Sequence, residues 1–161
     1  MLKVNRKVEY GLIALKHMNG KPKGELSTVR EICERYGTPF DPLAHVLRTL
    51  NAAGVLQSEQ GAHGGYRIVG NLEELSFADL IEMIDGQLAF TDCLKSGFCA
   101  CTIAEHCNII SPMFTVNKRL LEFLRTITLV ELVEHDEVWP AELSKQMGGR
   151  FTHSDQTVRP A

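Results

Sequence analysis

The 161-residue chain contains 44% hydrophobic and 23% charged residues, a composition ordinary for a globular protein. Its first residues are polar, and no stretch approaches the roughly 20 apolar residues that a membrane helix needs. These features exclude the secreted and membrane-spanning classes, so we expect a cytoplasmic protein. The net charge is -3, but residues 1–70 carry ten Lys and Arg against six Asp and Glu, whereas residues 71–161 carry seven against fourteen. The first half is therefore suited to contact phosphates.

The first half of the chain predicts three helices. Apolar spacing predicts the first over residues 5–18, and the capping-box pair Thr28 and Glu31 predicts the second, which Gly37 ends in a left-handed conformation. Asp41 followed by Pro42 predicts the start of the third. That helix turns its leucines and valine inward and leaves the following side chains more exposed: Pro42, Ala44, His45, Arg48, Thr49 and Asn51.

Residues 55–59 and 66–69 predict two short strands joined by a glycine-rich tip. Helix, helix, short turn, helix and hairpin is the order of a winged helix-turn-helix, whose third helix enters the major groove of DNA. The predicted fold class is therefore mainly α with a small β-hairpin. A winged helix used for protein contacts, in an enzyme or scaffold subunit, stays open as an alternative. The candidate DNA-binding residues are His45, Arg48, Thr49, Asn51, Gln60 and His63.

The second half predicts a fourth helix after Ser76, an aperiodic segment, and a long helix opened by Ser111 and Pro112. The long helix has an apolar stripe of near-heptad spacing, which a second copy of the chain could cover. Thr128 caps a short helix through Val133, and a polar tail follows. The expected domains are a winged helix-turn-helix (1–84), a cysteine-rich loop (85–108), a dimerisation helix (109–135) and a disordered tail (136–161).

Four of the five cysteines lie within fifteen positions, at 93, 99, 101 and 107. In a chain without a signal peptide, such a cluster indicates metal binding or redox chemistry. Thiolates suit an iron–sulfur cluster, zinc or copper(I), and a metal-free thiol–disulfide sensor is a further alternative. The fifth, Cys33, lies on an apolar helix face and is predicted to be a packed core thiol. No nucleophile–base constellation or phosphate loop is present, so we expect no enzyme.

Four runs of sequence carry a resemblance to a known family: EICERYG at 31–37, LNAAGVL at 50–56, GAHGGY at 61–66 and LRTITLVEL at 124–132. Over residues 1 to about 134, the chain resembles the iron–sulfur winged-helix regulators of the IscR, NsrR and RirA type. The resemblance implies a homodimer that binds a palindromic operator in double-stranded DNA, usually as a repressor. Gln60 stands where relatives often have arginine, and Ala44 where some have an acidic residue, so the operator sequence cannot be carried over.

The resemblance also implies an iron–sulfur cluster, with [4Fe-4S] favoured over [2Fe-2S], that senses iron, nitric oxide or redox state. The relatives use three loop cysteines, the last two separated by five residues. This spacing selects Cys101 and Cys107. Cys93 then precedes Cys101 by a gap like that of the RirA-type proteins. Cys99 remains an alternative to Cys101.

A fourth ligand is needed to hold a cubane cluster fully. IscR-type relatives supply a histidine soon after the last cysteine, but Ile110 occupies that place here. NsrR-like relatives supply a carboxylate from the first helix of the partner subunit, and the matching position is Glu9. His106 and Asp92 are rival ligands. The predicted metal ligands are therefore Cys93, Cys101, Cys107 and Glu9.

Overall fold

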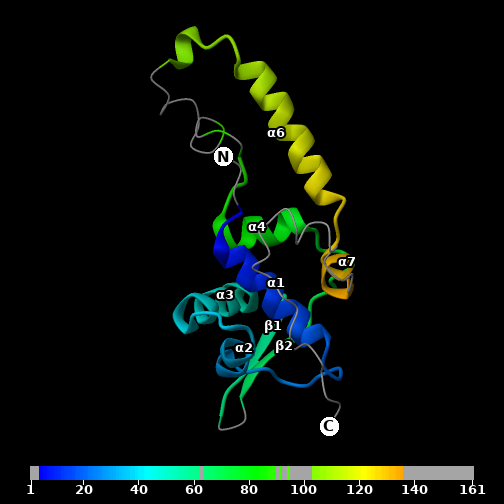
Figure 1. The fold of residues 1–161 in the computed structure, drawn as a ribbon. Helices are drawn as coiled ribbons and strands as arrows, with labels where there is room; N and C mark the ends of the chain where they lie inside the picture. Colours follow the sequence, from blue (N-terminus) through cyan, green and yellow to red (C-terminus); the bar gives the residue numbers. More distant parts are fainter. Residues whose placement is uncertain (1–3, 62–63, 90, 92–93, 95–102, 136–161) are drawn as a thin grey trace, which may run out of the picture.

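The computed structural model describes residues 4–61, 64–89, 91, 94 and 103–135 (Figure 1). In these ranges, the helices are accompanied by one two-stranded antiparallel hairpin that extends from one end of the body (Figure 1), which confirms the predicted mainly α class. The elements in chain order are α1 (Arg6–Asn19), α2 (Val29–Tyr36), α3 (Phe40–Ala52), β1 (Leu56–Glu59), β2 (Gly65–Ile68), α4 (Phe77–Asp85), the 3-10 helix η2 (Ala104–His106), α6 (Ile110–Arg125) and α7 (Leu129–Glu134). No helix within these ranges is both long and apolar enough to cross a bilayer.

Local capping explains where several helices begin and end. Thr28 Oγ1 accepts the Glu31 N–H at 3.1 Å, and Glu31 Oε2 accepts the Thr28 N–H at 3.3 Å, which completes a capping box before α2. Ser76 and Asp79 form the same box before α4. At the end of α2, Gly37 has a φ of 67°, a left-handed conformation that glycine adopts without a steric penalty. These contacts confirm the predicted caps.

Two predicted helix starts are wrong. α3 begins at Phe40 with Pro39 as its N-cap, so Asp41 lies inside the first turn. α6 begins at Ile110, and Ser111 also lies inside its first turn. A carboxylate interacts favourably with free N–H groups throughout the first turn of a helix, and proline is tolerated there because those groups have no intrahelical acceptor. Such residues therefore mark the region of a helix start better than its first residue.

A third, very short segment at Ser27 pairs with the free edge of the hairpin. β1 and β2 pair from Leu56–Ile68 to Glu59–Gly65, and the Ser27 and Tyr66 backbones exchange two hydrogen bonds of 2.9 Å on the other edge of β2. A Cβ atom on Gly65 would lie 2.8 Å from the Ser27 carbonyl oxygen, so only glycine allows this approach. The wing is therefore hydrogen-bonded to the segment that leads into α2.

The core forms where α1 packs against α3, α4 and α7. α3 packs against both α1 and α2, so its buried face is wider than one stripe. Ala44 lies on that wide face and is only 8% exposed, which corrects the prediction that it points outward. The side chains buried on α3 are Leu43, Ala44, Val46, Leu47 and Leu50.

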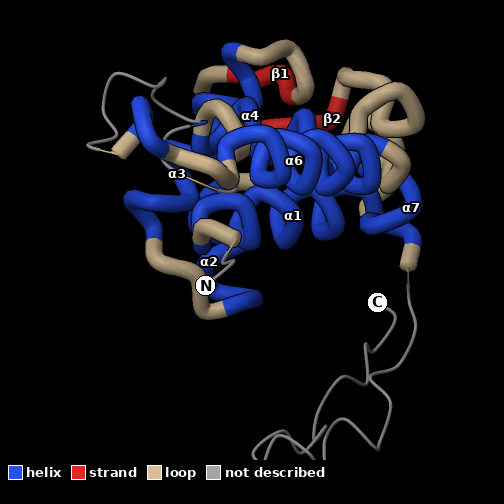
Figure 2. The backbone as a smooth tube through the Cα atoms, turned by 90° about the horizontal axis from the view of Figure 1, so that it is seen from above, coloured by secondary structure: helices blue, strands red, loops and turns tan. Residues whose placement is uncertain are grey.

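α7 is distant from α1 in sequence but lies beside it in the fold (Figures 1 and 2). Leu129 and Val133 of α7 are buried in the same core as α1. Backbone hydrogen bonds of 2.8 Å from Phe77 N to Ile127 O and from Leu129 N to Leu75 O fix the segment before α7 against the start of α4. The chain therefore leaves the winged-helix body after α4, returns along α6 and re-enters the core through α7 (Figure 1).

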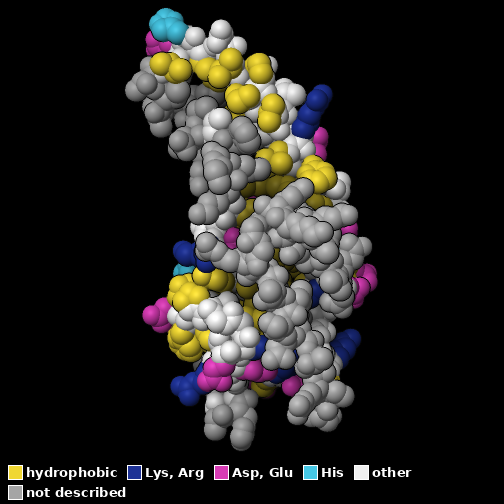
Figure 3. All heavy atoms as spheres, in the orientation of Figure 1, with side chains coloured by type: hydrophobic (Ala, Val, Ile, Leu, Met, Phe, Trp, Pro, Cys, Tyr) yellow, Lys and Arg dark blue, Asp and Glu magenta, His cyan; other side chains and the backbone are white. Residues whose placement is uncertain are grey.

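α6 projects from this body as an arm (Figure 1). It contacts α4, yet none of its residues is fully buried. Phe114 and Phe123 are 59% and 61% exposed, and Val116 is also exposed. Hydrophobic side chains gather along the arm in the space-filling view (Figure 3). The described part of one protomer thus leaves a large apolar surface uncovered, which is typical of an interaction site.

Candidate nucleic-acid interface and cysteine site

The outward face of α3 presents polar side chains beside the wing. His45 and Arg48 are exposed on this helix. Among the described residues, the Arg48 guanidinium has no acceptor, so it is available to a phosphate or a base edge. A charged donor held on a rigid helix suits DNA recognition because the helix fixes its direction.

Thr49 and Asn51 lie on the same helix but already make hydrogen bonds within the protein. Thr49 Oγ1 donates to the His45 carbonyl at 3.1 Å. Asn51 Oδ1 accepts the Ser58 N–H of β1 at 2.8 Å. Asn51 therefore connects the end of α3 to the wing, and its amide nitrogen is the part left for a further acceptor. The DNA-binding roles of both residues stay predictions.

The solvent-facing side of the wing carries a cross-strand cluster of polar residues. Arg67 of β2 lies 2.5 Å from a carboxylate oxygen of Glu59 and donates to Gln57 Oε1 at 2.8 Å, both on β1. The Arg67 guanidinium is thus neutralised by a carboxylate on the neighbouring strand of the wing. Gln60 follows β1 and is exposed, whereas His63 lies outside the described residues.

The cysteine site is only partly within the described ranges. Cys107 lies between η2 and α6 as a free, half-buried thiol. Cys93, Cys99 and Cys101 lie outside the described residues, as does the rival ligand Asp92. Their proposed ligand roles therefore stay predictions.

Of the other thiol and ligand candidates, Cys33 is half-buried, packs against the core and accepts a hydrogen bond from Thr38 Oγ1 at 3.6 Å. His106 is exposed at the end of η2. Glu9 is exposed in the first turn of α1, and its carboxylate has no cation or donor among the described residues.

The donor set fits an iron–sulfur cluster chemically, because free thiols and an unpaired carboxylate are both possible ligands. Within the described ranges, however, no three potential ligands come together. The segment before α6 lies at the far end of the arm, whereas Glu9 belongs to the first turn of α1, in the body (Figure 1). Such a separation within one protomer is compatible with a carboxylate supplied by a second copy.

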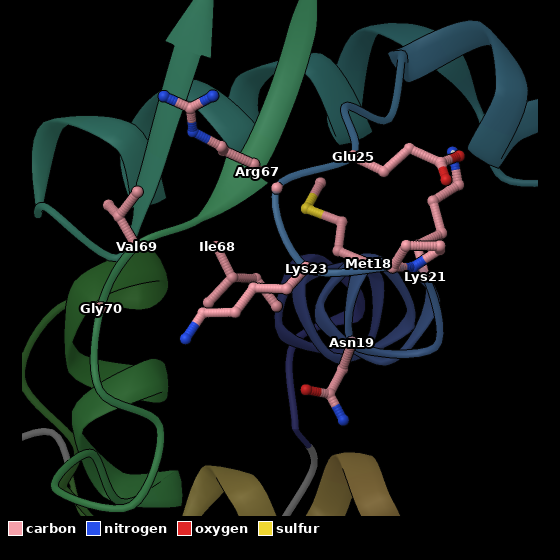
Figure 4. Close-up of a pocket in the computed structure, with 11 residues that line it drawn as sticks. Met18, Asn19, Lys21, Lys23, Glu25, Arg67, Ile68, Val69 and Gly70 are labelled. Atoms are coloured by element: carbon pink, nitrogen blue, oxygen red, sulfur yellow. The ribbon is translucent and has the colours of Figure 1, made fainter.

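A cleft of about 580 Å³ lies between the α1–α2 loop and β2 (Figure 4). Two of its cations are already paired, since Lys21 contacts Glu25 at 3.2 Å and Arg67 contacts Glu59. Its lining contains neither cysteine nor histidine. Because the cleft offers no cluster of reactive groups, the candidate site is better assigned to α3, the wing and the cysteine segment.

Two groups of interacting residues were not predicted from the sequence. One is the Glu59–Arg67 pair, which strict alternation along the two predicted strands could have indicated. The other joins His17 of α1 to Glu31 and Tyr36 of α2. His17 follows Ala14 by three residues and so lies on the buried side of its helix, a position where histidine needs polar partners.

Comparison with known proteins agrees with this architecture. Residues 4–135 match the Rrf2 family, described as an iron-dependent transcriptional regulator. The chain is 22% identical over 129 residues to the HTH-type transcriptional regulator NsrR of Shouchella clausii (strain KSM-K16), which covers 80% of this chain and 87% of that protein.

Two solved structures share the fold. CymR, the global cysteine regulator of B. subtilis, aligns with a TM-score of 0.65 at 21% identity, over 85% of this chain and all (100%) of that one. IscR of T. potens aligns with a TM-score of 0.56 at 25% identity, over 88% of this chain and 96% of that one. The family match spans most of the chain and confirms the resemblance noted from its sequence runs: this chain belongs to the Rrf2 family of transcriptional regulators.

Proposed function

We propose that the chain is a dimeric DNA-binding regulator, acting as a repressor, whose affinity for a palindromic operator is controlled by an iron–sulfur cluster. The observation that carries this proposal is the presence, in one chain, of a family match over residues 4–135 and four closely spaced cysteines before the α6 arm. The family description as iron-dependent and the similarity to NsrR and IscR support it.

In this proposal α3 enters the major groove and the wing follows the adjacent minor groove. His45 and Arg48 make the direct contacts, because both are exposed and neither side chain makes a hydrogen bond or ion pair with the described residues. Thr49, Asn51, Gln60 and His63 complete the DNA-binding set, with Asn51 also setting the angle between α3 and the wing. Two copies, joined through their α6 arms, present two such heads to two half-sites.

Cys93, Cys101 and Cys107 would hold the cluster, with Glu9 of a second copy as the fourth ligand. When bound, such a cluster supplies a metal centre that iron scarcity, nitric oxide or oxygen can alter. Ligation by α1 of one copy and the cysteine segment of the other would fix the relative position of the two DNA-binding heads. Couplings of this kind change affinity by about five- to 150-fold.

Anaerobic purification tests the cluster. We expect a brown protein with broad visible absorbance, lost in Cys107→Ser and in Cys101→Ser but retained in Cys33→Ser, since Cys33 contacts the core and Thr38. Glu9→Ala should shorten the lifetime of the absorbance in air. A colourless protein with stoichiometric zinc, or a colourless metal-free one, would instead favour a zinc-containing or a thiol–disulfide regulator.

DNA binding is tested separately by footprinting on the region upstream of the protein's own gene, followed by anisotropy titrations of the protected fragment. If Arg48 contacts a phosphate, Arg48→Ala should weaken binding similarly across sequences. It should also reduce the slope of log affinity against log salt concentration by about one. Lys118→Ala removes the same charge from the exposed surface of α6 and serves as the control. Equal losses in both variants would remove Arg48 from the interface.

A further inference from the structure

A single histidine connects the end of α1 to both ends of α2. His17 is only 5% exposed, although it carries a polar ring. Its Nε2 lies 3.0 Å from Glu31 Oε1 in the first turn of α2, and its Nδ1 lies 3.2 Å from the hydroxyl of Tyr36, the last residue of that helix. The His17 and Tyr36 rings also meet edge to face, with centroids 5.5 Å apart.

The partners determine which nitrogen of a neutral His17 carries the proton. A carboxylate accepts but cannot donate, so Nε2–H donates to Glu31 and Nδ1 accepts from the Tyr36 hydroxyl. Both ring nitrogens are then satisfied, as a buried imidazole requires. A phenylalanine at this position could neither donate to Glu31 nor accept from Tyr36.

Glu31 is itself held by several donors. Lys21 Nζ lies 2.6 Å from Glu31 Oε1, and the Thr28 N–H donates to Oε2. Burial pushes the pKa of Glu31 upward, but hydrogen bonds from Lys21, His17 and Thr28 outweigh it and hold the pKa below its ordinary value. For Lys21, burial lowers the pKa while Glu31 and Glu25 raise it, and the net change is upward. Both shifts favour the charged forms, so Lys21 and Glu31 are both ionised at neutral pH.

α2 is short, and besides Ile32 its apolar contacts with the core come from the half-buried Val29 and Cys33. It has eight residues, and Ile32 is the one residue it buries completely. A short helix with one fully buried residue is weakly held against rotation, and bonds from one rigid ring to both its first turn and its last residue resist that rotation. α3 packs against α2 as well as directly on α1, so the orientation of α2 contributes to that of α3.

We infer that His17 is a positioning residue, which fixes α2, and through α2 the DNA-facing helix α3, against α1. The last step rests on the proposed function, while the fixing of α2 does not. His17 contacts neither the candidate DNA-binding residues nor the cysteines in the described part of the chain; it acts through Glu31 and Tyr36.

Amide hydrogen exchange on the full chain tests the fixing of α2. His17→Phe keeps an aromatic ring, although a larger one, and removes the hydrogen bonds to Glu31 and to the Tyr36 hydroxyl. We expect exchange in residues 29–36 to accelerate at least about tenfold, while residues 77–85 of α4 change less than about twofold. His17→Gln, which can still donate to Glu31, should restore most of the protection. Unchanged exchange in α2, or equal acceleration in α4, would overturn the inference.

A milder variant covers the case in which His17→Phe does not fold. Tyr36→Phe removes the hydroxyl of a residue that is 42% exposed and removes no carbon atoms, and it should accelerate exchange at the end of α2 selectively. No change in that segment would count against the inference just as clearly.

Titration of the operator fragment completes the test. His17→Phe should bind it at least about tenfold more weakly than the wild type, and His17→Gln should recover most of the affinity at equal stability. If the wild type does not bind DNA, the proposed function fails, but the exchange data still decide whether His17 fixes α2. If α2 is loosened and affinity stays unchanged, the step from α2 to α3 is wrong.

Discussion

Ser27 and Ser76 are both buried, but only one of them has a hydrogen-bonded hydroxyl. Ser76 Oγ accepts the Asp79 N–H as the cap of α4. The Ser27 hydroxyl has no hydrogen-bond partner among the described residues, although its backbone pairs with Tyr66 on both sides. Burying a hydroxyl without a partner costs free energy, so the two serines should respond oppositely to the same substitution.

We therefore expect Ser27→Ala to leave the free energy of unfolding unchanged or to raise it by up to about 1 kcal/mol, because alanine keeps the backbone bonds and removes an unsatisfied group. Ser76→Ala should lower it by about 1 kcal/mol through loss of the cap. Urea unfolding of both variants measures the difference. A clear loss of stability in Ser27→Ala would mean that its hydroxyl has a partner outside the described residues.

Glu31 makes stability depend on pH. Its pKa is held below the ordinary value of 4.5, so the folded state favours the carboxylate. The resulting stabilisation is present above the unfolded-state pKa and is lost as the pH falls through the folded-state value. The free energy of unfolding of the wild type should thus approach that of Glu31→Gln as the pH falls below about 4.5. A difference that stays constant over this range would contradict the assigned role of Lys21 and His17 in lowering the pKa.

At the scale of elements, the wing of this chain carries less available positive charge than its sequence indicates. Arg67 is its one arginine, and Glu59 and Gln57 occupy its guanidinium. Since non-specific DNA affinity comes mainly from cations near phosphates, this pairing weakens the electrostatic contribution of the wing. Gln60, in the place where relatives often have arginine, adds to the same effect.

Glu59→Gln should therefore strengthen DNA binding and steepen the dependence of log affinity on log salt by about one, because Arg67 becomes free to contact a phosphate. Glu73→Gln removes the same charge from an exposed turn outside the wing and serves as the control. Anisotropy titrations at several salt concentrations measure both slopes. Identical slopes for the two variants would show that only net charge had changed.

The elements also show what the sequence could predict. The caps at Thr28 and Ser76 and the left-handed Gly37 were predictable because each depends on a few adjacent residues. The burial of Ala44 and the His17–Glu31 bond were not, because they depend on how separate helices pack. The same holds for the candidate site: residue types and spacing indicate which side chains could be ligands, but they do not predict whether those side chains meet in space.

At the scale of the whole molecule, α6 and α7 connect the arm mechanically to the DNA-binding body. α7 is buried against α1, and the segment before it is hydrogen-bonded to the start of α4. A rotation of α6 relative to the body would therefore strain these contacts. This connection gives an assembled dimer a route by which the arms can influence the two α3 helices.

The arm also provides the sharpest test of assembly. Ile109, Val116 and Phe123 recur every seven residues at the start of and along α6, which places them on one side of the helix, and all three are exposed. Phe114 is equally exposed but lies about half a turn from Phe123.

If the heptad side joins two copies, Phe123→Glu should shift the protein to monomer in light scattering and weaken operator binding, whereas Phe114→Glu should remain dimeric. Neither change should alter the fold of the body, because neither side chain is buried in the protomer. Dimers that survive Phe123→Glu and dissociate in Phe114→Glu would place the interface on the opposite side of the arm.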